Sequence, residues 1–295
     1  MVHFLKGCKP EKKLRNLVLY GNYGSCMVKQ KVFPFEYYGV SREDLLSTSE
    51  VSYPKPSEPP VRLLAVPKTL KGPRMIASEP VAHQFLQLGL MKWFRDNMPK
   101  PLRLSIDFLD QQPSQAACLK ASKTWNEIAT VDLSAASDRL SCWVVERLFR
   151  SNPSILEALH ATRSRWLVNA TGIGEPFFLL LKKYAPMGNG TTFPVQSIVY
   201  AIIAIACTIY EKGCKVNYST VCQVAQDIRV FGDDIILPSS AVTSLVTALD
   251  YLGLKVNRKK TFAVGPFRES CGMDAYMGVD VTPLYLRDLS LGDSA

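Results

Sequence analysis

The chain has 295 residues, 47% of them hydrophobic, which allows one large domain or two small ones around a packed core. Its formal net charge of +9 suits a polyanionic partner such as RNA or DNA, although many basic proteins bind neither. The eight cysteines are scattered without a C-x-x-C pair, which argues against a zinc site and fits a reducing compartment. The first residues contain no long apolar run, so we expect no signal peptide.

The first 60 residues differ in composition from the rest of the chain. They are basic at first and then rich in Pro, Ser and Glu, and Ser49–Pro60 reads S-E-V-S-Y-P-K-P-S-E-P-P. Such a stretch is typical of an extended linker or a surface loop. We therefore predict that residues 1–60 form a part of their own, separate from the rest of the chain.

Two short strands follow the linker and enclose a basic loop. Val61–Val66 and Met75–Ala77 are apolar runs of strand length. Between them, Lys68, Lys71 and Arg74 would bring several cations to one rim of a sheet. The alternative is a solvated loop, in which a cluster of charges has no further role.

Three helices are predicted around the next strand. They run from Glu79-Pro80 through Arg95, from about Arg139 to Arg150, and over Ser154–Asn169. The strand itself, Thr130–Leu133, places Asp132 among apolar neighbours, where a carboxylate needs a partner. Asp138 could simply be the N-cap of the helix that follows.

A loop containing Gly, Asn and Gly precedes the most apolar stretch of the chain. Pro176–Tyr184 is strand-like, and P-M-G-N-G-T-T then leads into Phe193–Tyr210. Glycines allow the backbone to approach a ligand closely, although a plain turn before a helix would look the same. Phe193–Tyr210 approaches the length of a membrane span, but its first turns contain Pro, Gln and Ser. We predict a buried core helix and no membrane association.

The stretch Val230–Leu237, V-F-G-D-D-I-I-L, predicts a tight β-hairpin with Asp233 and Asp234 at its tip. Two adjacent carboxylates between buried strands repel each other and are costly to desolvate. A hard divalent cation would relieve both problems, because such ions prefer oxygen ligands. An ordinary hairpin turn is the alternative.

The chain beyond this hairpin returns to the same layer. We predict an amphipathic helix over Ser239–Leu252 with a Ser cap and Gly253 as its stop, then a basic strand over Lys255–Val264. A second hairpin-like region, F-R-E-S-C-G and Y-M-G-V-D-V, follows. The order of elements from Thr130 indicates an α+β fold, an antiparallel-leaning sheet with helices on one face.

Asp132 and Asp233 each lie at the end of an apolar strand. If those strands are neighbours, the carboxylates of Asp132, Asp233 and Asp234 converge. Two divalent ions held there could activate a hydroxyl, orient a triphosphate and stabilise the leaving group. The basic loop would then clamp the phosphates, and the glycine-containing loop would support a template or a nucleotide.

Five motifs occur in one order: V-P-K-T-L-K-G-P-R-M-I-A-S-E-P, T-V-D-L-S-A-A-S-D, M-G-N-G-T-T-F-P-V-Q-S, V-F-G-D-D-I-I-L-P-S and F-R-E-S-C-G…G-V-D-V-T-P-L-Y. This order resembles an RNA-directed RNA polymerase, specifically the replicase subunit of the levivirus-type positive-strand RNA bacteriophages. The resemblance spans Val61 to Arg287, and residues 1–60 carry none.

The resemblance implies a right-hand polymerase fold. Its palm, residues 130–295, would hold an antiparallel sheet with helices, and residues 61–129 would form part of the fingers. The thumb would be largely absent, as in a chain truncated at Ala295. The resemblance also implies RNA template and product strands, ribonucleoside triphosphates, two Mg²⁺ or Mn²⁺ ions, host translation factors, and the cytoplasm of a bacterial host.

Roles for individual residues also follow from the resemblance. Asp132 matches the metal-binding Asp of motif A; Asp233 and Asp234 match motif C, with Asp233 as the principal ligand. The positions that would meet the nucleotide are Lys68, Lys71 and Arg74 of motif F, Ser137 and Asp138 at the end of motif A, and Gly188, Asn189, Gly190 and Thr192 of motif B. Gln196 stands where many viral polymerases carry a ribose-sensing Asn.

Lys259 or Lys260 matches the motif D lysine, a general acid for pyrophosphate departure. For either lysine, the alternative is a solvated position at a strand edge. Phe267–Gly272 matches the hairpin that supports the primer or product strand.

Three other functions compete with this one. The polymerase of a fungal narnavirus or mitovirus-like element shares much of the pattern and differs mainly in M-G-N-G and F-R-E-S-C-G. A reverse transcriptase is disfavoured by Phe231-Gly232 and by Ser137-Asp138. A non-catalytic RNA-binding module would suit the charge, but it has no need to concentrate three carboxylates where RNA would lie.

Overall fold

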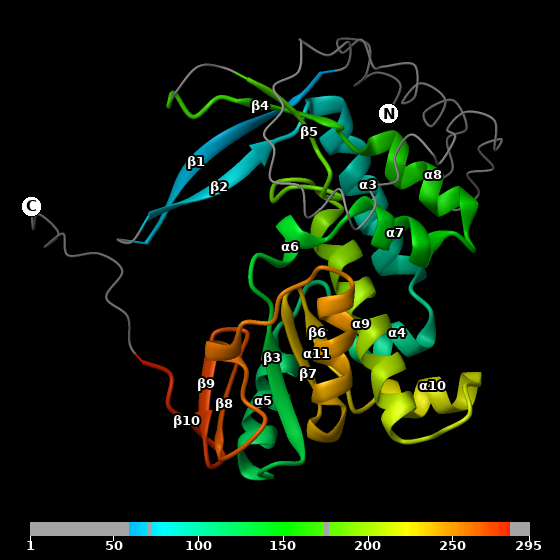
Figure 1. Ribbon diagram of the computed structural model, residues 1–295, viewed down its shortest axis with the longest axis vertical. Helices are drawn as coiled ribbons and strands as arrows, with labels where there is room; N and C mark the ends of the chain where they lie inside the picture. Colours follow the sequence, from blue (N-terminus) through cyan, green and yellow to red (C-terminus); the bar gives the residue numbers. More distant parts are fainter. Residues whose placement is uncertain (1–58, 70–71, 174–176, 284–295) are drawn as a thin grey trace, which may run out of the picture.

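The computed structural model describes residues 59–69, 72–173 and 177–283, which form three sheets and a set of surrounding helices (Figure 1). The largest sheet has the strand order β2-β1-β4-β5. Its strands are β1 (Val61–Thr69), β2 (Gly72–Ser78), β4 (Trp166–Asn169) and β5 (Phe178–Leu180). Neighbouring strands are antiparallel except for β1 and β4, which are parallel. The two predicted strands around the basic loop are therefore confirmed as an antiparallel pair.

The central sheet carries the Asp residues that the sequence singled out. It consists of β3 (Ile128–Asp132), β7 (Asp234–Pro238) and β6 (Arg229–Phe231), in the order β3-β7-β6 and antiparallel throughout. The predicted hairpin is present, and the strand with Asp132 is its neighbour. The register pairs Asp132 with Asp234, so the two residues lie side by side at one end of the sheet.

A third sheet closes the described chain. It contains β8 (Phe267–Ser270), β9 (Met273–Tyr276) and β10 (Val279–Asp280), which confirms the predicted second hairpin. The helices are α3 (Val81–Asn97), α4 (Lys100–Ser105), α5 (Gln112–Lys123), α6 (Ala136–Arg139), α7 (Cys142–Phe149), α8 (Pro153–Thr162), α9 (Thr192–Glu211), α10 (Tyr218–Ala225) and α11 (Val242–Tyr251), with 3₁₀ turns at Ser239–Ala241 and Arg258–Lys260.

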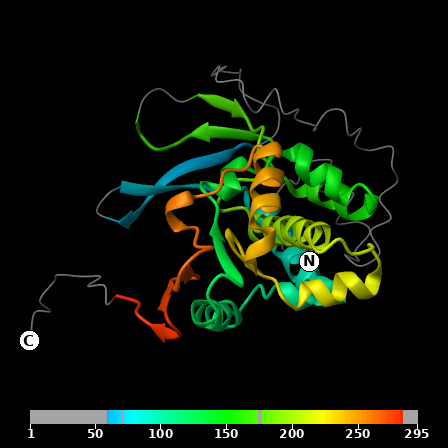
Figure 2. The ribbon, with the colours of Figure 1, turned by 60° about the horizontal axis from the view of Figure 1, so that its bottom comes forward.

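Helices cover both faces of the central sheet, so the prediction of helices on one face is wrong. Successive residues of β7 alternate: Ile235 and Leu237 join the main core with α9 and α11, whereas Ile236 packs against Cys118 of α5. In Figure 2, α5 is seen nearly end-on between the central sheet and the strands β8 to β10. Each of these buried aliphatic side chains stabilises the fold by roughly 1.5–3 kcal/mol relative to an exposed one.

Helix α9 forms the centre of the main core, as predicted for Phe193–Tyr210. By length and apolar composition it could cross a membrane, but 83% of its most apolar window is buried inside the protein. Its residues Val199, Tyr200 and Ala201 have no exposed surface. An apolar helix that is covered by its own protein is a core helix, and that prediction is confirmed.

The predicted helix over Ser154–Asn169 ends early, at Thr162. Its second half is strand β4, which pairs with β1 on one side and β5 on the other. Arg163 stops the helix by turning its guanidinium to the carbonyls of Tyr184, Leu181 and Lys183, at 2.5, 2.6 and 2.9 Å. Tertiary pairing of Trp166–Asn169 therefore outweighs its local helical pattern.

Two predictions downstream of the β6–β7 hairpin are also wrong. Lys255–Val264 is not a strand: single bridges at Val256 and Phe262 flank the 3₁₀ turn Arg258–Lys260. The turn forms because the carbonyl of Asn257 accepts bonds from the Lys260 amide and the Thr261 hydroxyl. No Ser cap begins α11, since the Ser239 hydroxyl donates to the carbonyl of Ala263 instead. The predicted stop at Gly253 is confirmed by its φ of +77°.

Candidate active site

Residues in the first turns of α9 fix the turn between β6 and β7. Gly232 has a φ of +65°, which favours glycine, and a Cβ there would lie 3.1 Å from the ring of Phe193. The Gly232 amide donates a hydrogen bond of 3.1 Å to the Ser197 hydroxyl. The helix therefore determines where Asp233, the exposed residue at the tip, can lie.

Hydrogen bonds from residues that follow the central sheet in the chain hold Asp132 and Asp234 in place. The Asn257 amide donates a 2.7 Å hydrogen bond to the Asp132 carboxylate, and the Cys271 backbone amide donates one of 3.0 Å to that of Asp234. Burial raises the pKa of Asp234 to about 6, and the charges of Asp233 and Asp132 add to that rise. Burial likewise raises the pKa of Asp132, with Asp233 contributing. The three carboxylates thus repel one another across the end of the sheet.

These carboxylates are neighbours, but they do not form a finished metal centre. Within residues 59–69, 72–173 and 177–283, no three His, Cys, Asp or Glu side chains lie together as a ready ligand set. The hydrogen bonds from Asn257 and Cys271 engage one oxygen each of Asp132 and Asp234. Their donor atoms nevertheless fit a hard divalent cation, which would offset the mutual repulsion. The shared metal site stays a prediction.

A cavity of about 470 Å³ opens beside Asp233. Its lining includes eight residues predicted as site residues, from β2, α6, the glycine-containing loop, α9 and the β6–β7 turn: Arg74, Ser137, Asp138, Gly188, Asn189, Thr192, Gln196 and Asp233. The chain positions that supply them are far apart in sequence. The side chain of Arg74, a polar loop and the carboxylate of Asp233 therefore face one space.

Polar groups on the cavity wall differ in whether they already have an ion-pair or hydrogen-bond partner within the protein. Lys183 forms an ion pair of 2.5 Å with Asp138. The Thr192 hydroxyl donates to the carbonyl of Pro186 at 2.8 Å. The side-chain oxygen of Gln196 is buried without a hydrogen-bond partner, although a buried acceptor normally has one. Gln196 therefore lines the cavity with a buried acceptor to which the described residues donate no hydrogen bond.

Other predicted residues lie elsewhere. Asp132 and Asp234 do not line this cavity, and Gly190 packs against Gln87. The side chain of Lys68 and the whole of Lys71 are outside the described residues, as is most of Ser49–Pro60.

The two candidate lysines are in different places. Lys260 forms an ion pair with Glu269, which raises the pKa of Lys260, and the charges of Asp132 and Asp234 add to the rise. Lys259 is exposed and lines a separate cavity of about 390 Å³ with Asp250 and Lys255. Of the two, Lys260 is the one within electrostatic reach of the acidic residues.

Sequence reasoning missed four residues that shape the site: Glu79, Ser197, Asn257 and Cys271. Asn257 holds Asp132 through its side chain, and Cys271 holds Asp234 through its backbone amide, at a φ of +51°. Ser197 acts one residue away, because its hydroxyl accepts the hydrogen bond of the Gly232 amide that precedes Asp233. Only Glu79, in S-E-P just after an apolar strand, carried a usable signal, because a carboxylate next to a strand end often has a specific partner. It is 5% exposed.

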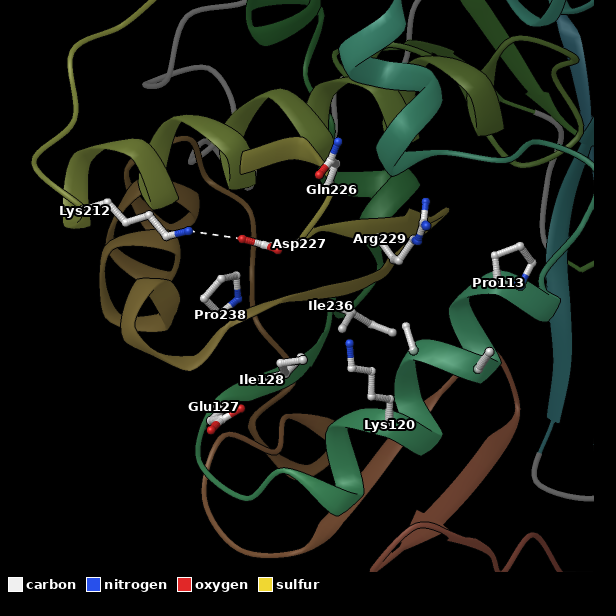
Figure 3. Close-up of a pocket in the computed structure, with 12 residues that line it drawn as sticks. Pro113, Lys120, Glu127, Ile128, Lys212, Gln226, Asp227, Arg229, Ile236 and Pro238 are labelled. Carbon is white, nitrogen blue, oxygen red and sulfur yellow. Dashed lines mark hydrogen bonds and ion pairs between the residues drawn. The ribbon is translucent and has the colours of Figure 1, made fainter. Parts of the chain in front are cut away.

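A second cavity, of about 560 Å³, lies at the far end of the central sheet between α5 and the β6 and β7 strands (Figure 3). None of the predicted site residues lines it. Its charges are partly neutralised internally: Lys212 pairs with Asp227 at 3.1 Å, and Arg229 donates to the carbonyl of Leu104. This cavity therefore does not compete with the one beside Asp233.

Comparison with known proteins decides the family. The family model described as RNA replicase, beta-chain matches residues 36–290. The chain belongs to this family. The match begins inside residues 1–60, so the expectation that this segment carries no resemblance is wrong. Among its relatives is the RNA-directed RNA polymerase subunit beta of Escherichia virus Qbeta, 39% identical over 231 residues, which cover 77% of this chain and 35% of that protein.

Two further relatives match nearly the same share of this chain. The subunit beta of Enterobacteria phage SP is 40% identical over 77% of this chain and 36% of that protein; the RNA-directed RNA polymerase beta chain of Escherichia phage MS2 is 34% identical over 76% and 37%. The chain spans about a third of the length of these relatives. A solved telomerase from Candida albicans, in complex with a telomeric RNA fragment, has a similar fold, with a TM-score of 0.50, 14% identity, and coverage of 76% of this chain and 45% of that one.

Proposed function

We propose that this chain carries the nucleotide-joining centre of a bacteriophage replicase, which copies a viral RNA genome from an RNA template. The observation that carries the proposal is the cavity that brings Arg74, Asp233 and the Gly188–Asn189 loop together, in a chain of the RNA replicase beta-chain family. Relatives named as phage RNA-directed RNA polymerases favour a phage over a fungal element.

Asp132, Asp233 and Asp234 would hold two Mg²⁺ or Mn²⁺ ions. The support is their common position at one end of the central sheet, together with the pKa values of Asp132 and Asp234, which burial raises and the neighbouring carboxylates raise further. Bound ions of this kind activate a hydroxyl and stabilise charge on reacting phosphates. The chain itself supplies the positioning, through Ser197, Asn257 and the Cys271 amide.

The cavity beside Asp233 would take the incoming ribonucleoside triphosphate. Arg74 is exposed on β2 and would pair with phosphate oxygens, which suit a guanidinium. Gln196, Ser137 and Asp138 line the same cavity and would meet the ribose of the nucleotide. Lys68 and Lys71 would extend the basic rim. Lys260, rather than Lys259, would give a proton to departing pyrophosphate, because its pKa responds to the charges of Asp132 and Asp234.

The sheets would then have the roles of a right-hand polymerase. The central sheet with α9 and α11 would be the palm, and β1, β2 and α3 part of the fingers. A low-identity likeness to telomerase supports the fold only. RNA strands would be the partners, the host cytoplasm the place of action, and host translation factors further partners, as the resemblance implies.

The test is extension of an RNA primer on an RNA template by the full gene product, with ribonucleoside triphosphates and Mg²⁺ or Mn²⁺. Asp233→Asn keeps the size and one neutral oxygen but removes the charge. We expect a loss of at least about a hundredfold in rate, the scale for removing a preorganised charge-stabilising group. RNA binding should persist, since the basic surface provides it. Synthesis at the parental rate by Asp233→Asn would disprove the metal-site assignment.

A further inference from the structure

A buried carboxylate connects the strand that carries Arg74 to the glycine-containing loop. Glu79 follows β2 directly and is 5% exposed. One carboxylate oxygen accepts a 2.6 Å hydrogen bond from the Ser164 hydroxyl, and the other accepts one of 2.9 Å from the Asn189 amide. The bond to Asn189 bridges 110 residues of sequence, from the end of β2 to the wall of the cavity.

Asn189 in turn organises the loop Pro186–Thr192. Its side-chain oxygen accepts hydrogen bonds from the Thr191 amide at 2.8 Å and the Thr191 hydroxyl at 2.7 Å. Glu79 therefore decides which way the Asn189 amide faces: with the nitrogen turned to the carboxylate, the oxygen is left for Thr191. A reversed amide would lose the bonds to Glu79 and from the Thr191 backbone amide, because an oxygen would face the carboxylate and an NH2 group would face the amide.

The adjacent backbone is packed too tightly to shift independently. The Ala77 amide donates a 2.7 Å hydrogen bond to the Met187 carbonyl. A Cβ on Gly188, whose φ is +111°, would lie 2.1 Å from the Ala77 carbonyl oxygen. On the other side, the Gly190 amide donates to the Gln87 side chain at 3.1 Å. The loop and the β2–α3 junction thus form one body.

The side chains around Glu79 donate hydrogen bonds to it, so its position requires a hydrogen-bond acceptor. Ser164, Asn189 and Gln87 all direct donors at Glu79, and their hydrogen bonds oppose the burial that raises its pKa. An ionised carboxylate accepts without donating, so it satisfies several donors at once. Stability alone does not require such a buried ion, because well-packed apolar groups are often as good.

We infer that Glu79 is a positioning residue for the nucleotide site: through Asn189 it fixes the loop that forms one wall of the cavity facing Asp233 and Arg74. The inference rests on the proposed function for its kinetic consequence. The geometric part, that Glu79 orders the loop, holds independently of which reaction the cavity serves.

The first experiment measures amide hydrogen exchange in the intact chain and in Glu79→Met, which keeps the length and burial but removes the acceptor. Exchange at Gly190 and Thr191 should accelerate by about tenfold or more, because local opening becomes easier. Glu157→Gln is the matched control: Glu157 is also buried, on α8, and makes no hydrogen bond to the loop. It should leave loop exchange unchanged.

A reversal of the hydrogen bond separates positioning from general damage. Asn189→Asp sets two carboxylates against each other and should accelerate loop exchange. Adding Glu79→Gln to that variant lets the new amide donate to Asp, and should restore exchange to within about threefold of the parent. A double variant no slower in exchange than Asn189→Asp alone would overturn the inference, as would unchanged exchange in Glu79→Met.

The kinetic readout uses RNA synthesis by the full gene product. Glu79→Met should raise KM for ribonucleoside triphosphates by about tenfold while kcat changes less than about threefold, because the wall of the binding cavity is loosened and the acidic residues are untouched. An equal fall of kcat in Glu79→Met and Glu157→Gln would indicate a purely structural role and contradict the inference. A parent that makes no RNA would disprove the proposed function, and the exchange experiment would still decide the role of Glu79.

Discussion

Burial raises the pKa values of both Asp234 and Glu79, yet the two acids have different surroundings. Asp234 is partly exposed, and two further carboxylates, Asp233 and Asp132, raise its pKa more, while hydrogen bonds from Cys271 offset part of the rise. Glu79 is buried, and its neighbours are hydrogen-bond donors and the cation of Arg163. The negative charge around Asp234 is therefore compensated only in part, whereas these neighbours of Glu79 favour its ionised form.

The difference distinguishes a carboxylate suited to a cation, Asp234, from a carboxylate that fixes the conformation of its neighbours, Glu79. Partly compensated carboxylates at an accessible sheet end lower the cost of bringing in a divalent cation. A carboxylate surrounded by donors gains nothing from such an ion and instead fixes the groups around it. The same residue type therefore serves two purposes within one fold, and the two can be separated experimentally.

Asp234→Asn should produce the largest effect and the clearest contrast. We expect RNA synthesis to fall by at least about a hundredfold, because the ion-binding charge is lost. Without divalent ions at pH 7.5, the free energy of unfolding should rise by up to about 2 kcal/mol, because the variant removes the cost of burying an ionised carboxylate and its repulsion by Asp233 and Asp132. Mg²⁺ or Mn²⁺ should raise the melting temperature of the parent and of Glu79→Gln, but not of Asp234→Asn. An equal ion response in Asp234→Asn would break the contrast.

Gly188→Ala tests the packing of the glycine-containing loop against β2. A Cβ 2.1 Å from the Ala77 carbonyl, at a φ of +111°, must displace backbone. The free energy of unfolding should therefore fall by roughly 2–5 kcal/mol, measured by urea denaturation. Gly172→Ala is the control, because Gly172 also has positive φ, +77°, but open space around it. A similar loss in both variants would mean that φ alone, and not the contact with β2, constrains the loop.

The sequence predicted the parts of the site that depend on local pattern. The hairpin with Asp233 and Asp234, the strand with Asp132, and α9 were all read from apolar runs and turn residues. Helices α4 and α5 were not predicted, although each carries a proline in its first turn, a position where proline is typical of a helix start. Helix α10 had a usable signal in Asn217, which caps it by accepting from the Thr220 amide.

The supporting residues could not be predicted, because their roles arise from long-range contacts. Asn257 meets Asp132 across 125 residues, and nothing in K-V-N-R-K-K marks it. The strand β4 exists because β1 and β5 lie on either side of it. Local sequence therefore identified the acidic residues, while tertiary structure identified what holds them.

Arg74→Ala should have a smaller effect, confined to the nucleotide. Arg74 is exposed on the cavity wall, so its removal should cost little stability. We expect KM for ribonucleoside triphosphates to rise by about tenfold, while the RNA dissociation constant changes less than about twofold. Arg147→Ala, an exposed arginine on α7 away from the cavity, is the control. Equal losses in nucleotide use and RNA binding would instead mean a general electrostatic role.

The smallest expected effect is a pH dependence of stability that comes from Glu79. Burial raises its pKa in the folded protein above the value in the unfolded chain. In the window between the two values the folded protein binds the proton and the unfolded chain does not. This contribution to stability is therefore fully present below the unfolded pKa and is lost as the pH rises through the folded pKa. Glu79→Gln cannot titrate and should show a flatter profile.

Urea midpoints of the parent and Glu79→Gln between pH 5 and pH 8 measure this term. The variant should gain stability relative to the parent as the pH increases, whereas Ser164→Ala, which removes one donor and leaves the carboxylate, should shift the window to higher pH. That shift follows because the lost hydrogen bond had lowered the pKa of Glu79. If the parent and Glu79→Gln keep a constant difference across the range, Glu79 has the same ionisation in both states. The compensation by its donors would then be more complete than the raised pKa indicates, which would widen the contrast with Asp234.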